Sequence, residues 1–76
     1  MPKLPVLSGI EIVKALKKIG YEPDHQTGSH IILRQNFEPH RRVTVPNHPE
    51  VSKKTLRAII RETGLTRESF DELVNG

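Results

Sequence analysis

Residues 28–45, GSHIILRQNFEPHRRVTV, decide the fold because their polar and apolar side chains alternate as they do in β-strands. In the run 30–34, Ile31 and Leu33 share one face of the strand, and the residues between and beside them share the other. The run 41–45 repeats the pattern, with its two valines on the inward face. The alternation predicts two antiparallel strands with one face buried and the other in water.

A third strand is expected upstream, joined to the first run by the turn residues Thr27-Gly28-Ser29. The turn leaves two registers open. If the loop is its first two residues, His25 lies opposite His30; if the loop is its last two, His25 pairs with Ile32. Pro23 has no N–H for a central ladder, so this strand is predicted to be an edge strand or to begin after the proline.

Helical signals flank the strands. Ser8 is expected to cap a helix over 9–19, and Ser52 to cap a second helix over 53–63. Thr66 is expected to cap a last short helix. The order α-β-β-β-α-α predicts an α+β fold, a three-stranded antiparallel sheet with its helices on one face.

Length and composition limit the function. The chain has 76 residues, with 12 Lys and Arg against 9 Asp and Glu, which gives a formal charge of +3. A chain this short buries only about 60% of the surface it exposes when unfolded, so one domain over 1–76 with a shallow site is expected. The absence of cysteine excludes disulfides, thiolate zinc sites and a cysteine nucleophile. No apolar run exceeds three residues, so a soluble, cytoplasmic protein is expected, with residues 1–7 leading into the first helix.

Histidine is the main candidate for chemistry. The four histidines show no helical HxxxH pair, so no metal site is expected. His30 follows Gly28-Ser29 at the start of a strand, where a glycine lets other groups approach closely. An imidazole titrates near neutral pH and serves as a general acid or base, so His30 is a catalytic candidate. Its alternative role is structural, in closing the hairpin, and His25 and His40 are expected to be surface residues.

Positive charge gathers in the segment 53–61, which holds four basic residues and no acidic one. The segment 66–76 has one arginine against three acids, so the charge is polarised along the chain. Lys53 and Lys54 lie at the expected N-terminus of the second helix, where backbone N–H groups favour a phosphate. A solvated helix face, with its arginines paired to nearby acids, is the alternative.

Five short motifs, in this order and spacing, resemble the HicA (YcfA-like) toxin family, and the resemblance covers about residues 8–74. The motifs are Ser8-Gly9, Leu16-Lys17-Lys18-Ile19-Gly20-Tyr21, Gly28-Ser29-His30, Val45-Pro46-Asn47-His48 and the stretch from Thr55 to Leu65. The chain departs from the family at Lys54-Thr55-Leu56, where the family usually has Gly-Thr-Leu.

The resemblance implies a double-stranded-RNA-binding-domain-like fold. It also implies an mRNA interferase, an endoribonuclease that forms the toxin half of a type II toxin–antitoxin pair with a HicB-like antitoxin. The essential histidine of the family maps onto His30, and its preceding Gly and Ser map onto Gly28 and Ser29 as supporting residues.

Within this resemblance, we expect His30 to move a proton while a ribose 2′-OH attacks the adjacent phosphodiester. The RNA supplies the nucleophile, so cleavage without metal or cofactor is expected, leaving a cyclic phosphate or 3′-phosphate and a 5′-hydroxyl. Lys53, Lys54 and Arg57, together with Arg42, are expected to hold phosphates.

Two other functions remain open from the sequence. A non-catalytic RNA-binding module would use the same fold and charges without turning RNA over. A purely protein-binding role would instead use Ile10 and Ile32 as exposed apolar contacts, although single exposed apolar residues need no explanation.

Overall fold

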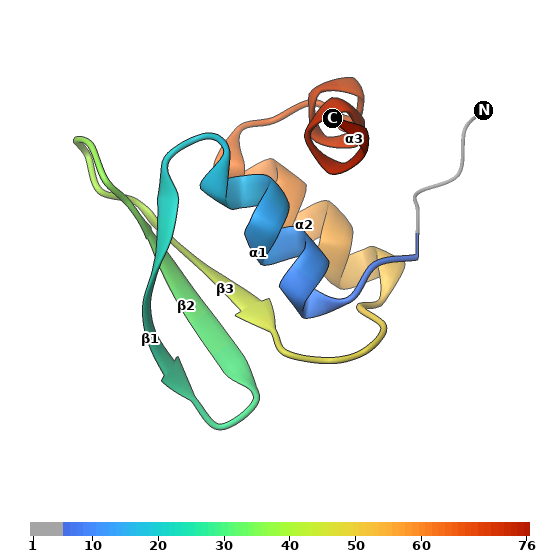
Figure 1. Cartoon of the computed structure of the whole chain (residues 1–76), viewed down its shortest axis with the longest axis horizontal. Coiled ribbons are helices and arrows are strands. Elements are labelled where there is room, and N and C mark those ends of the chain that lie inside the picture. Colours follow the sequence, from blue (N-terminus) through green and yellow to red (C-terminus); the bar gives the residue numbers. More distant parts are fainter. Residues whose placement is uncertain (1–5) are drawn as a thin grey trace.

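A computed structural model describes residues 6–76, and the first five residues of the predicted lead-in lie outside this range. The elements are α1 (Gly9–Lys17), β1 (Tyr21–Thr27), β2 (His30–Gln35), β3 (Arg42–Pro46), α2 (Lys53–Thr63) and α3 (Arg67–Asn75). This order confirms the predicted α-β-β-β-α-α succession, and Figure 1 shows the sheet beside the helices. In the described part of the chain, no helix has the length and hydropathy needed to cross a membrane.

The sheet is antiparallel with the order β1-β2-β3, so β2 is its central strand. The β1–β2 loop is Gly28-Ser29, which pairs Thr27 with His30 and places His25 opposite Ile32. The second of the two registers left open by the sequence is therefore the observed one. Pro23 lies in the edge strand β1, as predicted, and a bulge follows it before His25.

The inward face of the sheet is apolar, as the alternation predicts. The buried residues of this face are Ile31, Leu33, Val43 and Val45. On the opposite face, Ile32 is half-buried in β2 and Thr44 is exposed in β3. The open face of the sheet therefore carries the polar residues of β2 and β3, including His30.

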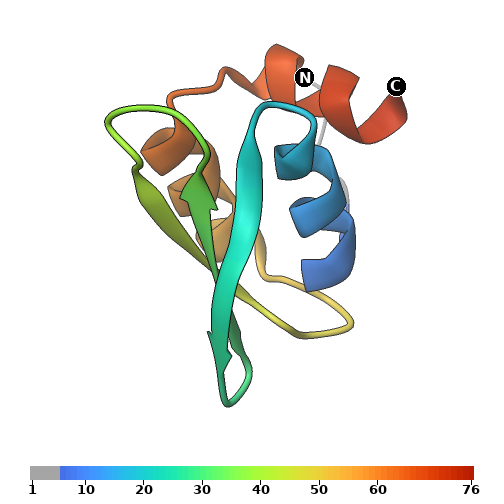
Figure 2. The same ribbon diagram turned by 60° about the vertical axis from the view of Figure 1, so that its left-hand side comes forward.

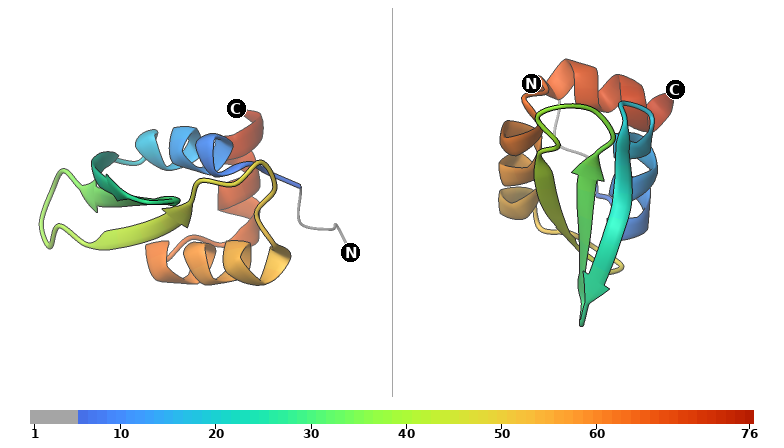
Figure 3. Two further views of the ribbon diagram at one scale, coloured as in Figure 1. Left: turned by 90° about the horizontal axis from the view of Figure 1, so that it is seen from below. Right: turned by 90° about the vertical axis from the view of Figure 1, so that its left-hand side faces the viewer.

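Two helices cover the buried face. α1 packs behind β1, and α2 packs behind β3, so the sheet lies in front of both helices in the right-hand view of Figure 3. α3 packs against α1 instead of lying on the sheet. Even so, Phe70 of α3 is fully buried in the common core, which also contains Leu16, Leu33 and Leu56.

Capping decides where the helices begin and end. Ser8 accepts a hydrogen bond from the backbone N–H of Glu11, and the Glu11 carboxylate accepts one from the backbone N–H of Ser8, which forms a capping box. The predicted helix over 9–19 ends at Lys17, because the N–H groups of the next three residues bond three positions back and tighten the final turn. The bounds of α2 agree with the prediction, with Ser52 as the N-cap.

Replacing Phe70 with alanine tests whether α3 is part of the cooperative core. We expect the free energy of unfolding, measured by denaturant titration, to fall by about 3–5 kcal/mol because a fully buried ring is lost. Phe37→Ala is the control, since Phe37 is 47% exposed, and it should cost less than about 1 kcal/mol. Equal, small losses in the two variants would show that α3 folds independently of the core.

Candidate functional site

His30 is the first residue of β2 and lies on the open face of the sheet. The tight Gly28-Ser29 turn precedes it, and Gly28 has φ +56°, a left-handed conformation that glycine adopts without strain. The turn and its two strands project beyond the helices, as Figure 2 shows. His30 also pairs with Pro46 of β3, so its backbone is held by strands on both sides.

A cleft of about 460 Å³ opens beside His30. Its walls come from the start of β2, the end of β3, the β3–α2 connection and the first turn of α2. The lining residues are His30, Thr44, Pro46, His48, Glu50, Ser52 and Thr55. The cleft thus combines two imidazoles, a carboxylate and three hydroxyl groups in a site wide enough for part of an extended polymer.

Backbone hydrogen bonds hold the β3–α2 connection against its neighbours. The N–H of Gly9 donates to the carbonyl of His48 at 2.9 Å, and the N–H of Val51 donates to the carbonyl of Leu7 at 2.8 Å. The N–H of Asn47 donates to the carbonyl of Ser29. This wall of the cleft is therefore attached by hydrogen bonds both to the start of α1 and to the β1–β2 turn.

Gly9 permits this attachment because it has no side chain. A Cβ atom at this position would lie 2.1 Å from the carbonyl oxygen of Pro46, well inside van der Waals contact. The Ser8-Gly9 pair therefore combines a helix cap with a close approach of two backbones, and both features contribute to the shape of the cleft.

The basic residues of α2 flank the cleft without lining it. Lys53 and Lys54 are exposed and lie between Ser52 and Thr55, both of which do line it. Arg57 is one turn further along the same helix and is also exposed. Among residues 6–76, neither Arg57 nor Arg61 forms an ion pair with an acid, so the pairing expected in the alternative is not seen. Both arginines are exposed, as a solvated helix face requires.

Arg42 has a different environment. It lies on the open face of β3, two residues from Thr44, and its Nε is 3.9 Å from a carboxylate oxygen of Asp24. The same oxygen accepts a hydrogen bond of 3.0 Å from Nδ1 of His25. The hydrogen bond from His25, and after it the charge of Arg42, lower the pKa of the Asp24 carboxyl from its ordinary value. Arg42 is thus partly neutralised, unlike the basic residues of α2.

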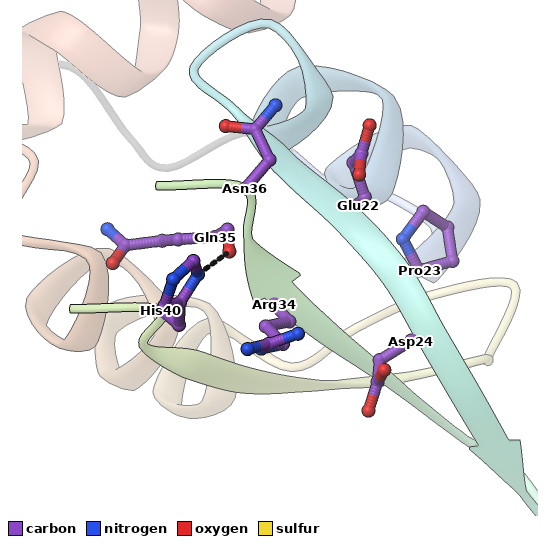
Figure 4. A pocket seen from close by; sticks show the side chains of 7 residues that line it. All are labelled: Glu22, Pro23, Asp24, Arg34, Gln35, Asn36 and His40. Atoms are coloured by element: carbon purple, nitrogen blue, oxygen red, sulfur yellow. Dashed lines mark hydrogen bonds between the residues drawn. The ribbon is translucent and has the colours of Figure 1, made fainter. Parts of the chain in front are cut away.

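A second, smaller cleft of about 220 Å³ lies at the other end of the sheet and is shown in Figure 4. It is lined by Glu22, Pro23, Asp24, Arg34, Gln35, Asn36 and His40. The His40 ring is engaged there, with Nδ1 3.1 Å from the carbonyl oxygen of Gln35. Neither His40 nor His25 therefore lines the cleft that contains His30 and His48.

The sequence and the fold were compared with those of known proteins. The family model described as HicA toxin of bacterial toxin–antitoxin matches residues 9–65, three quarters of the chain. The chain belongs to the HicA toxin family. A solved toxin–antitoxin complex from Streptococcus pneumoniae contains a chain that is 32% identical, with a TM-score of 0.66, over 78% of this chain and 98% of that one. No curated protein sequence gave a significant match.

Membership of the HicA family confirms the resemblance and the α+β architecture predicted from the sequence. The structure adds residues that the sequence reasoning did not choose as site residues, namely His48 and Glu50, and the hydroxyls of Thr44 and Thr55. The motif Val45-Pro46-Asn47-His48 could have indicated that His48 belongs to the site. Linear spacing alone, however, does not show that this motif lies beside Ser29-His30 in the fold. Within residues 6–76, no group of three or more His, Asp or Glu side chains is arranged to hold a metal ion.

Gly9→Ala tests the attachment of the β3–α2 connection to α1. The added methyl group forces two backbones apart, so we expect a loss of about 1–3 kcal/mol in the free energy of unfolding. We also expect faster hydrogen exchange at the Asn47 amide, because its acceptor on Ser29 moves away.

Gly64→Ala is the matched control. Nothing lies within 4 Å of a Cβ at Gly64, so only the left-handed backbone is strained, at about 1–2 kcal/mol. In Gly64→Ala, hydrogen exchange at the Asn47 amide should match that of the parent protein once the change in global stability is taken into account. Unchanged Asn47 exchange in Gly9→Ala would contradict the role given to Gly9.

Proposed function

We propose that this HicA-family chain is an mRNA interferase that cleaves RNA with His30 as its catalytic histidine. The observation that carries the proposal is the position of His30. It is exposed at the edge of a cleft that also reaches the N-terminus of α2, the most basic helix of the chain. A substrate that is an extended polyanion suits a shallow cleft with cationic side chains at its rim.

In the proposed reaction, His30 acts as a general base. Its imidazole takes the proton of a ribose 2′-OH while that oxygen attacks the adjacent phosphorus. The P–O5′ bond breaks, leaving a 2′,3′-cyclic phosphate and a 5′-hydroxyl. The nucleophile belongs to the substrate, so this scheme requires no cofactor or metal from the protein.

Gly28 and Ser29 are proposed to support the histidine. Gly28 makes the tight turn that sets the direction of β2, and the Ser29 carbonyl ties that turn to the opposite wall of the cleft through Asn47. The hydroxyl of Ser29 is exposed and is proposed to orient the imidazole or to donate to a phosphate oxygen.

The partners follow from the same proposal. Lys53, Lys54 and Arg57 would hold phosphates that enter or leave the cleft, and Arg42 would make a weaker contact because of Asp24. The S. pneumoniae neighbour was solved as a toxin–antitoxin complex, and we propose a HicB-like antitoxin as the protein partner of this chain. An mRNA substrate places the active protein in the cytoplasm.

His30→Ala is the direct test of catalysis. We expect cleavage of labelled RNA by the purified protein in EDTA to fall by roughly 10²- to 10⁴-fold, because the general base is lost. Growth arrest on expression should be lost as well. His25→Ala is the matched control, since His25 is an exposed histidine outside the cleft, and it should cleave like the parent protein.

Several results would contradict this assignment. A His30→Ala variant that still cleaves RNA and arrests growth would exclude His30 as the catalytic residue. Binding of RNA by the parent protein with no cleavage products would instead favour the non-catalytic RNA-binding module. Cleavage only after magnesium is added would contradict the metal-free scheme.

The phosphate contacts of α2 are tested by the double variant Lys53→Ala/Lys54→Ala. Binding to 2′-O-methyl RNA, which lacks the 2′-hydroxyl nucleophile, should weaken, and its salt dependence should become shallower. A loss of two contacts reduces the slope of log K against log salt by about 1.4, at roughly 0.7 for each phosphate neutralised on a single strand. The control is Lys14→Ala/Lys17→Ala, which removes equal charge from the exposed face of α1. Equal slopes in the two double variants would show that only net charge matters.

A further inference from the structure

We propose that His48 is a second catalytic residue, the general acid that protonates the 5′-oxygen leaving group. This inference rests on the proposed ribonuclease function and deepens it. The observation behind it is the placement of His30 and His48 on the walls of one cleft by direct backbone contacts.

The chemistry requires two proton transfers. Attack by the 2′-oxygen releases a proton, and departure of the 5′-oxygen as a hydroxyl takes one up. An imidazole that has just accepted the first proton lies on the side of the nucleophile, opposite the leaving group in an in-line displacement. A second group with a proton to give is therefore needed on the other side of the phosphorus.

Backbone pairing brings His48 to the required place. His30 pairs with Pro46 across the sheet, and the N–H of Asn47 donates to the carbonyl of Ser29. Ser29 precedes His30 and Asn47 precedes His48, so this hydrogen bond joins the two chain segments directly before the histidines. The two imidazoles then face the same cleft from different walls, one from the sheet and one from the β3–α2 connection.

The position of His48 is fixed by its own main chain. Its carbonyl accepts a hydrogen bond from the first residue of α1, Gly9, whose missing side chain allows this close approach. The connection is tied again at Val51, which forms an isolated β-bridge with Leu7. The main chain that carries the His48 ring is therefore held in place beside the cleft, which reduces the positioning that proton transfer requires.

The other histidines are engaged elsewhere. The ring of His25 is bonded to Asp24, and that of His40 to the Gln35 carbonyl. In the described part of the chain, neither the His30 ring nor the His48 ring forms a hydrogen bond or an ion pair, so both are free to meet a substrate. Glu50 is the third titratable side chain of the cleft and lies on the same connection as His48.

The proposed step balances. The O2′–P bond forms as the 2′-OH proton passes to His30, and the P–O5′ bond breaks as His48 gives its proton to O5′. The products are a 2′,3′-cyclic phosphate, a 5′-hydroxyl, a protonated His30 and a neutral His48. When water opens the cyclic phosphate, its proton passes to His48 and His30 protonates O2′, which restores both rings and leaves a 3′-phosphate.

The test is His48→Gln assayed on two RNA oligonucleotides that contain one site cut by the parent protein. One oligonucleotide is ordinary RNA, and the other has sulfur in place of the bridging 5′-oxygen at that site. A thiolate leaves without being protonated, so cleavage of the sulfur substrate does not need a general acid. We expect His48→Gln to cut ordinary RNA roughly 10²- to 10⁴-fold more slowly than the parent protein and the sulfur substrate at nearly the parent rate.

Two variants act as controls. His30→Gln lacks the base, so it should fail on both substrates. His40→Gln changes a histidine outside the cleft and should cut both like the parent protein. His48 is exposed, so its substitution removes no buried contact, and equal melting temperatures and equal binding of 2′-O-methyl RNA would establish that the variant is folded.

Each remaining outcome overturns the inference in a distinct way. A parent rate for His48→Gln on ordinary RNA would exclude His48 as the acid while leaving the proposed function intact. Equal slowing on both substrates would show that His48 does not act on the leaving group. Failure of the parent protein to cut either substrate would remove the proposed function together with this inference.

Discussion

The close approach of two backbones at Gly9 is the contact on which the arrangement of the molecule depends. The start of α1, the end of β3 and the β1–β2 turn are far apart in the chain, yet hydrogen bonds at Gly9, Asn47 and Val51 connect them. Without this contact, the β3–α2 connection would be an ordinary surface loop, with many orientations and a large entropic cost on ordering. With it, a chain of 76 residues presents a fixed wall of polar side chains next to its sheet.

Much of the fold could be predicted from local patterns, because those patterns are themselves the physical causes of the elements. The alternation in 30–34 sets the buried face of β2, and Ser8 and Ser52 begin helices by capping free N–H groups. The end of α1 was predicted two residues too late, since a tightened final turn leaves almost no trace in the apolar period. The hairpin register was undecided until the structure, because the residues 27–29 permit two loops of equal length.

Only part of the candidate site could be predicted from the sequence. His30 stood out because of the Gly28-Ser29 turn before it, and the charge of α2 was readable from a count of residues. His48 was not predicted as a site residue, because its proximity to His30 arises from hydrogen bonds between segments about eighteen residues apart. The pairing of Arg42 with Asp24 was likewise hidden, because it depends on the bulge after Pro23 and on strand order.

The two prolines in the sheet have a consequence for how the molecule behaves in a crowded solution. β1 and β3 are the outer strands, and Pro23 and Pro46 each remove one N–H that a foreign strand would need for pairing. The bulge after Pro23 breaks the regular spacing of the outer edge of β1 as well. The sheet is thus poorly suited to growing by strand addition, and its exposed edges offer little template for self-aggregation.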